Sequence, residues 1–248
     1  MSEGSTHFGF SEIPLHEKVS RVREVFDSVA DRYDLMNDLM SMGIHRMWKW
    51  YAVHKLRLRP GDRVLDVAAG TGDLARLIHK QVGEDGQVVL SDINGSMLDK
   101  GRQQFIDDGL LHGFRWVQAN AEQLPFPDNY FQAVTIGFGI RNVTRIDAAA
   151  QEMVRVLRPG GQFMCLEFSQ VALPFLRPLY DLYSFNVLPL LGQYVANDRD
   201  AYQYLVESIR RFPPQEEFAA LLKKAGLGGV RYHNLSAGIV AVHVGYKV

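Results

Sequence analysis

The chain of 248 residues contains one cysteine, Cys165, and has no excess of charge of either sign. A single cysteine cannot form an internal disulfide, so a reducing compartment such as the cytoplasm fits the sequence best. The 27 basic and 28 acidic side chains leave a formal net charge of -1. A protein that binds a phosphate backbone is usually basic, so the sequence argues against a dedicated nucleic-acid binder.

Long apolar runs are missing as well. No stretch approaches the roughly 18 apolar residues of a membrane-spanning helix. The N-terminus lacks the basic region followed by an apolar region that marks a signal peptide. Histidine and cysteine show no spacing typical of a structural zinc site, so no metal is expected. The hydrophobic share of 47% with 22% charged residues is typical of a folded, enzyme-sized protein.

The first 60 residues are predicted to form a helical arm. Residues 18–30 place apolar side chains three or four positions apart, as one face of a helix requires. Residues 37–58 continue with apolar and aromatic side chains and a turn near Gly43. Pro60 and Gly61 then interrupt the chain, and the pattern changes. We therefore expect an arm over residues 1–60 and a second domain over 61–248.

The second domain alternates short apolar runs with helical segments. Strands are predicted over residues 63–68, 87–91, 114–118, 133–138 and 162–168, and helices over 72–82, 96–108 and 145–157. Strands separated by helices of this length form βαβ units, whose parallel sheet is covered on both faces. Right-handed crossovers then place a ligand crevice at the carboxyl ends of the strands.

The C-terminal part departs from this alternation. Residues 174–196 are rich in aromatic and aliphatic side chains and are interrupted by Pro174, Pro178 and Pro189, which predicts a broken helical insertion over about residues 171–212. A helix over 215–225 and two strands over 230–235 and 239–246 follow, and the strands are close enough to pair antiparallel. The expected fold is α/β and Rossmann-like, with a mostly parallel seven-stranded sheet and an antiparallel edge hairpin.

A loop of small residues after the first predicted strand of the domain is the main binding motif. Gly70, Thr71 and Gly72 open a helix whose N-terminus presents free backbone N–H groups. Asp92, twenty residues after Gly72, could accept both hydroxyls of a ribose, which indicates a nucleoside-bearing cofactor. Asp66 precedes the loop, where it would oppose the pyrophosphate of NAD(P) but could help to hold an ammonium group. This favours S-adenosylmethionine over a nicotinamide dinucleotide, although the loop alone fits both.

Further motifs make the chain resemble a known family. The runs 66–73, 120–131 and 157–161, with Asp92, are similar to the successive motifs of class I S-adenosylmethionine-dependent methyltransferases. More specific runs over residues 26–34, 36–41, 43–46, 138–143 and 195–198 resemble the UbiE/MenG family of ubiquinone and menaquinone biosynthesis C-methyltransferases. The resemblance extends over residues 6–246, which is nearly the whole chain.

The resemblance implies a cofactor site around the glycine loop. Thr71, Asp92, Asn120 and Ala121 occupy positions that bind S-adenosylmethionine in the family. Gly137 departs from the pattern, because the family often has a serine there that touches the cofactor, so only backbone can serve in this chain. The complete set of expected cofactor-binding residues is Asp66, Gly70, Thr71, Gly72, Asp92, Ile93, Asn120, Ala121 and Gly137.

By the same resemblance, the enzyme methylates a ring carbon of a polyprenylated quinol, either demethylmenaquinol or 2-polyprenyl-6-methoxy-1,4-benzoquinol. A sterol or phospholipid acceptor, a non-catalytic subunit of a quinone-synthesis complex and an NAD(P) oxidoreductase are the alternatives. Because the substrate is a lipid, the protein could contact the inner membrane peripherally. The sequence is also compatible with a homo-oligomer. Residues 175–195 and the N-terminal arm are candidates for a lid over the acceptor.

Several side chains could assist the transfer by acid-base chemistry or hydrogen bonding. Arg141 follows the fourth predicted strand and could bind an oxyanion or position a water molecule, or it could form a structural ion pair. Tyr33 and His45 in the arm are the other candidates for the catalytic group, with Tyr183 and His233 weighed beside them. Each could equally serve packing or an ordinary hydrogen bond. Cys165, in an apolar strand, is expected to be buried and inert.

Overall fold

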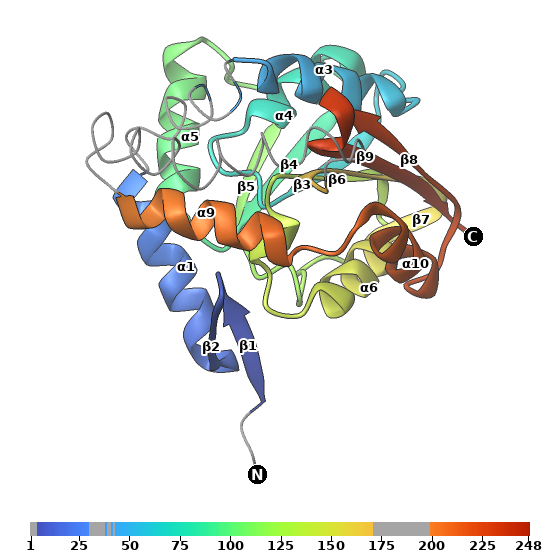
Figure 1. The fold of residues 1–248 in the computed structure, drawn as a ribbon. Coiled ribbons are helices and arrows are strands. Elements are labelled where there is room, and N and C mark those ends of the chain that lie inside the picture. Colours follow the sequence, from blue (N-terminus) through green and yellow to red (C-terminus); the bar gives the residue numbers. More distant parts are fainter. Residues whose placement is uncertain (1–3, 30–37, 39–40, 42, 171–198) are drawn as a thin grey trace.

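A seven-stranded sheet runs through the centre of the computed structural model, which describes residues 4–29, 38, 41, 43–170 and 199–248 (Figure 1). Its strand order is β5-β4-β3-β6-β7-β9-β8. The first five strands are parallel to one another, and β9 pairs antiparallel with both β7 and β8. The strands are β3 Arg63–Val67, β4 Gln87–Asp92, β5 Phe114–Gln118, β6 Phe131–Gly137, β7 Leu157–Phe168, β8 Leu227–Leu235 and β9 Val240–Lys247.

Helices cover both faces of this sheet (Figure 1). One face carries α3 His45–Lys55, α4 Asp73–Val82 and α5 Gly95–Asp107, and the other carries α6 Ile146–Val156 and α10 Gln215–Lys224. Alternate residues of β3 serve the two sides: Val64 belongs to the apolar cluster under α4, whereas Leu65 belongs to the cluster under α6. The predicted fold class is therefore confirmed, including the antiparallel strands at the C-terminal edge.

The strand order places a crevice at the carboxyl end of β3. From β3 the chain continues outward to β4 and β5, and it then returns to add β6 on the other side of β3. The loops that leave β3 and β6 consequently diverge, and ligands bind at such a point in open parallel sheets. Both loops hold a non-glycine residue in the left-handed region, Ala68 with φ 51° and Phe138 with φ 55°. Such conformations are strained, and they cluster at functional sites.

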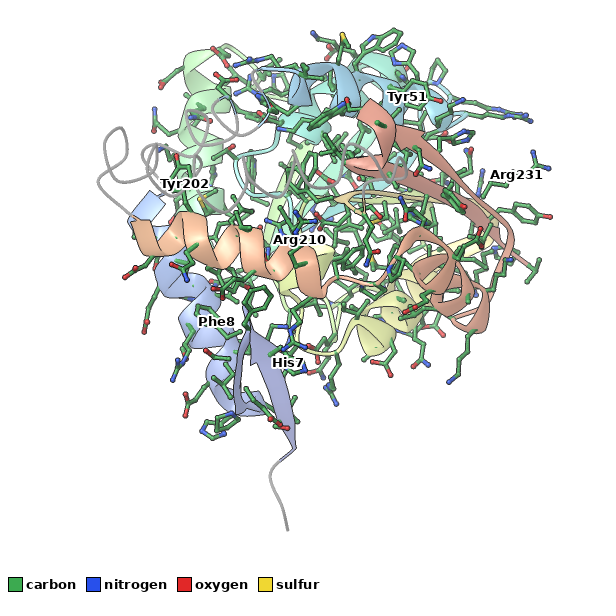
Figure 2. All side chains as sticks on the ribbon, viewed as in Figure 1. His7, Phe8, Tyr51, Tyr202, Arg210 and Arg231 are labelled. Atoms are coloured by element: carbon green, nitrogen blue, oxygen red, sulfur yellow. The ribbon has the colours of Figure 1, made fainter. Side chains whose placement is uncertain are left out.

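The N-terminal segment contains a hairpin that was not predicted. Strands β1 Ser5–Phe8 and β2 Ser11–Pro14 pair antiparallel and lead into α1 Leu15–Val29. The Phe8 ring of the hairpin stacks on Tyr204 of α9 (Arg199–Arg211) with ring centroids 4.3 Å apart, and Figure 2 shows Phe8 below α9. The hairpin thus depends on contacts from a helix almost 200 residues away in sequence, which its short polar strands do not reveal.

Two predicted boundaries need correction, and one predicted segment can be compared only in part. The helix expected over 145–157 ends at Val156, and the turn expected over 157–161 is the first part of β7. The pairing of β6 with β7 shifts register between Phe131 and Ala133, so these residues join the sheet irregularly. Of the broken helical insertion predicted over about residues 171–212, residues 171–198 with the three prolines lie outside the described residues, and Arg199–Arg211 form helix α9.

Cys165 lies fully buried in β7, as expected, and burial raises the pKa of its thiol well above the ordinary value. In the described part of the chain, no helix is long and apolar enough to cross a bilayer. The same residues contain no group of three or more histidine, cysteine or carboxylate side chains placed to hold a metal ion.

Candidate functional site

Two cavities open at the carboxyl ends of β3, β4 and β6. The larger has an open volume of about 830 Å³ and the smaller about 350 Å³. Ala68, Gly137 and Phe138 line both, so the two cavities meet where the loops after β3 and β6 approach each other. Each of these volumes lies in the range of small-molecule binding sites.

Two glycines of this junction lie close to side chains of the neighbouring elements. Gly72 has φ 92°, and a Cβ there would lie 2.8 Å from Leu90 and 2.9 Å from Phe105. At Gly137 a Cβ would lie 2.5 Å from Leu74, so a serine would first have to displace that side chain. The departure from the family pattern at position 137 thus coincides with a leucine that occupies the space, and only the backbone of Gly137 faces the cavities.

Asp92 lies at the end of β4 and lines the large cavity, as the sequence predicted. Its Oδ2 accepts a hydrogen bond from the backbone N–H of Gly70 at 2.9 Å, and its Oδ1 accepts one from Asn94 at 2.8 Å. Burial raises the pKa of Asp92, and these backbone N–H groups act in the opposite direction. The carboxylate is thereby fixed between two loops, and each oxygen keeps a lone pair that can accept a ribose hydroxyl.

The residues expected at the adenine end lie beside Asp92. Ile93, Asn120 and Ala121 all line the large cavity. The side-chain Oδ1 of Asn120 accepts the backbone N–H of Glu122 at 2.9 Å, so this oxygen closes a turn of the protein's own backbone. The amide nitrogen of Asn120 and the backbone of Ala121 are the groups that can still recognise an adenine edge.

Asp66, on β3, lines the small cavity and is almost completely buried. Thr135 Oγ1 donates a hydrogen bond to its Oδ1 at 2.7 Å. Burial raises the pKa of Asp66 to about 7, the hydrogen bond from Thr135 opposes this shift, and the nearby Asp92 and Asp73 add to it. A carboxyl group in this state gains most from a ligand that brings a positive charge.

Asp73 and Lys49 complete the charged wall of the small cavity, together with Thr71 of the glycine loop. Lys49 Nζ lies 2.5 Å from Asp73 Oδ2. Burial would raise the pKa of Asp73, but the charge and hydrogen bond of Lys49 outweigh it and lower the pKa. Lys49 was not predicted, because a lysine in an amphipathic helix gives no sign that it faces a cavity.

Arg141 lies apart from these cavities. It is 8% exposed in the 3-10 helix η2 (Ile140–Asn142), and its Nη1 lies 3.0 Å from Glu167 Oε1 and also donates to the carbonyl of Phe138. Ser208 of α9 accepts a hydrogen bond from its Nε at 3.3 Å. Arg141 lines a separate cavity between the hairpin, α1 and α9, so its contact with an acceptor stays a prediction and its ion pair is observed.

Of the other catalytic candidates, the two histidines that the structure describes line neither cavity. His45 is buried at the start of α3, where its Nε2 lies 2.9 Å from Asp38 Oδ1, and burial lowers its pKa. His233 lies on β8, with its ring centroid 6.2 Å from that of Tyr51. Tyr33 and Tyr183 lie outside the described residues.

Helix α1 supplies a wall that the sequence did not assign to the cofactor. Val19, Val22, Arg23 and Phe26 line the large cavity opposite the sheet. Asp27 of the same helix accepts a hydrogen bond from the side chain of Asn94 at 2.8 Å. The N-terminal segment therefore forms one wall of the large cavity, with three apolar side chains and one arginine.

Solved structures share this fold at low sequence identity. A protein from Thermotoga maritima, described as an S-adenosylmethionine-dependent methyltransferase and possible histamine N-methyltransferase, has a TM-score of 0.64 at 20% identity and covers 91% of this chain and 99% of its own. An Aquifex aeolicus S-adenosylmethionine-dependent methyltransferase has a TM-score of 0.57 at 19% identity, covering 81% and 89%. The fold is thus the class I methyltransferase fold.

Other proteins share a much higher sequence identity with this chain. A protein of Methylococcus capsulatus is 56% identical over 100% of both chains, and one of Legionella pneumophila is 54% identical over 98% of this chain and 97% of its own. Both are described as ubiquinone/menaquinone biosynthesis C-methyltransferase UbiE. The model of the ubiE/COQ5 methyltransferase family matches residues 15–247.

Fold and cavity together define an S-adenosylmethionine-dependent methyltransferase. This settles the alternative that the glycine loop left open, since a nicotinamide dinucleotide is not the cofactor of this class. More narrowly, the chain belongs to the ubiE/COQ5 methyltransferase family, as its resemblance predicted.

Proposed function

We propose that this methyltransferase acts on a ring carbon of polyprenylated quinols, with demethylmenaquinol and 2-polyprenyl-6-methoxy-1,4-benzoquinol as its acceptors. The observation that supports it most strongly is the identity of 54–56% to ubiquinone/menaquinone C-methyltransferases over nearly the full length of both chains. The large cavity combines Asp92 and Asn120 with the apolar side chains of α1, and the small cavity adjoining it has charged walls, so the two together offer the groups that a charged nucleoside cofactor needs.

Three groups of residues around the cavities would bind three parts of the cofactor: the ribose, the adenine and the amino-acid end. Asp92 accepts the two ribose hydroxyls, and Asn120 with Ala121 contacts the adenine. Asp66 faces the ammonium of the amino-acid end, while the loop at Thr71 allows close approach of the backbone. Each assignment follows from the groups that the cavity walls offer, namely a fixed carboxylate, an amide with backbone, and a buried carboxyl group that favours a cation.

When bound, S-adenosylmethionine supplies an electrophilic methyl group on a sulfonium, which an electron-rich quinol carbon attacks in line. The protein contributes alignment, because Phe138 lines the junction of the two cavities and apolar side chains of α1 line the larger cavity. A new carbon–carbon bond forms, the sulfur–methyl bond breaks, and the ring carbon loses its proton. Arg141, His45 and Tyr33 remain the predicted candidates that assist this proton loss.

The direct test is mass spectrometry of the product formed from S-adenosylmethionine and a short-tailed demethylmenaquinol under reducing conditions. We expect the product to gain the mass of one CH₂ group, and we expect the oxidised quinone to stay unmodified because it is a poor nucleophile. A protein that binds S-adenosylhomocysteine but methylates no quinol would contradict the acceptor. Methylation of a sterol or phospholipid in parallel assays would identify the competing acceptor class.

We further propose that the long-tailed acceptor brings the protein to a membrane surface. On α3, Met47 is 67% exposed and Trp50 is 52% exposed, and Lys55 on the same helix carries a positive charge, whereas the charge of Arg46 is paired with Asp38. Such a mixture favours the interface of an anionic bilayer. Flotation with anionic vesicles should recover the protein, and the double substitution M47S/W50S should reduce recovery. Equal recovery of both proteins would contradict the contact.

A further inference from the structure

The small cavity joins an N-terminal helix to the loop that opens α4. Asp66 and Asp73 supply its carboxylates, and Lys49 of α3 supplies the one ammonium among the described residues that line it. Lys49 precedes Asp73 by 24 residues. The charges of the small cavity therefore come from two separate parts of the chain, α3 and the segment from β3 to α4.

Lys49 retains hydrogen-bonding capacity toward this cavity. The side chain is 9% exposed, and Asp73 Oδ2, at 2.5 Å, is the hydrogen-bond partner of its Nζ within the described part of the chain. An ammonium group has three N–H donors, so one bond to Asp73 leaves two. Burial makes unused donors of a charged group unfavourable, and an anionic acceptor in the cavity would remove that cost.

The charge distribution decides which anion fits. Carboxylates of Asp66, Asp73 and Asp92 line the joined cavities, and they suit the sulfonium and ammonium of the methyl donor. The carboxylate of the same amino-acid end would be repelled by these three groups unless a cation faces it. Arg23, the cation on the large cavity, donates to the carbonyl of Ile93 at 3.4 Å near the adenosine end.

We propose that Lys49 binds the carboxylate at the amino-acid end of the methyl donor and of its product, while Asp66 faces the ammonium. This assignment rests on the proposed function, because it places the amino-acid end in the small cavity. Asp73 then holds Lys49 in position by its ion pair, and α3 becomes part of the cofactor site. A helix that precedes the sheet thus contributes to recognition of a ligand common to the whole fold class.

A matched pair of ligands tests the proposal. S-adenosylhomocysteine and its decarboxylated analogue differ by one carboxylate and share the ammonium, thioether and adenosine. In calorimetric titration, we expect loss of this carboxylate to weaken binding to the natural protein about ten- to a hundredfold, as for a charge-assisted hydrogen bond. We expect Lys49→Met to bind both ligands within about twofold of each other, and Lys49→Arg to retain most of the discrimination.

The control variant is Lys55→Met, which removes an exposed lysine from the same helix and should leave the discrimination unchanged. Equal binding of the two ligands by the natural protein overturns the proposal without recourse to a variant. Full discrimination retained by Lys49→Met also overturns it, since backbone N–H groups of α4 would then hold the carboxylate. A natural protein that binds neither ligand would instead refute the cofactor placement of the proposed function.

Discussion

Replacement of Asp66 by asparagine should remove a pH dependence from cofactor binding. In the free protein, burial raises the pKa of Asp66 to about 7, so near neutral pH about half of the molecules carry a neutral carboxyl group there. An ammonium beside it favours the ionised form and lowers the pKa in the complex. Binding should therefore release a proton, and affinity should increase as the pH rises through about 7.

The magnitude follows from the fraction ionised. At about pH 6 roughly one molecule in ten has the ionised form, and at about pH 8 nearly all do, so affinity should differ by about tenfold between them. Titration calorimetry of S-adenosylhomocysteine in buffers of different ionisation enthalpy measures both the affinity and the proton release. Asp66→Asn cannot titrate, so its affinity should be flat across this window and no proton should be released.

The free energy of unfolding of the ligand-free protein should fall as the pH rises, whereas the affinity for the cofactor should increase. Because the folded pKa of Asp66 lies above its ordinary value of 3.8, ionisation opposes folding, and the cost grows as the pH rises from about 4 to about 7. At 1.36 kcal/mol per pKa unit, the cost reaches about 4 kcal/mol above that window. Asp66→Asn keeps an acceptor for Thr135, so it should be more stable than the natural protein at about pH 8 and similar at about pH 4.

Two results would refute this reasoning. One is an affinity of the natural protein that stays constant between about pH 6 and about pH 8. The other is an Asp66→Asn variant that retains the full pH dependence, which would assign the titration to another group. Asp92, whose pKa burial also raises, is the neighbouring carboxylate that would then be examined.

Three further substitutions test the site and its support. Asp92→Ala should weaken S-adenosylhomocysteine about ten- to a hundredfold in calorimetry, since it removes a charge-assisted acceptor, and unchanged affinity would exclude the ribose assignment. Gly72→Ala should lower the urea midpoint of unfolding far more than Gly61→Ala. Both glycines have positive φ, but only at Gly72 would an added methyl group meet side chains, 2.8 Å from Leu90 and 2.9 Å from Phe105. Equal losses of stability in the two variants would contradict the packing argument. Glu167→Gln should cost about 3–5 kcal/mol of unfolding free energy by leaving buried Arg141 without its carboxylate, and a loss below about 1 kcal/mol would show that the ion pair is not needed.

The central strands of the sheet could be predicted from the sequence because they are buried on both faces. Runs such as residues 63–67 are largely apolar, and Gly or Pro residues lie close to their ends. The hairpin over residues 5–14 could not, because its strands are short and half exposed, and its support comes from α9. The local sequence pattern predicts a strand where the apolar side chains of that strand are themselves buried, and it does not where the support comes from a distant helix.

In the candidate site, too, some residues could be predicted from the local sequence and others depend on contacts between distant elements. Asp92 and the glycine loop could be found, because one chain segment fixes their spacing relative to the crevice. The role of Lys49 could not, since it depends on how α3 packs beside α4, and nothing in the helix distinguishes it from the exposed Lys55. An ion pair is one of the two roles that the sequence suggests for Arg141, but its partner Glu167 lies on β7, 26 residues away, and no local pattern identifies it.

The burial of Cys165 has a practical consequence for following the fate of this protein. A thiol with no solvent contact and a raised pKa should resist maleimide and iodoacetamide in the native state. Because it is the sole sulfhydryl and sits in the central sheet, its alkylation would count molecules that have opened globally. The rate of Cys165 alkylation would therefore report the rate of global unfolding. A cysteine introduced on the surface could be labelled with a fluorophore while the buried Cys165 stays unlabelled.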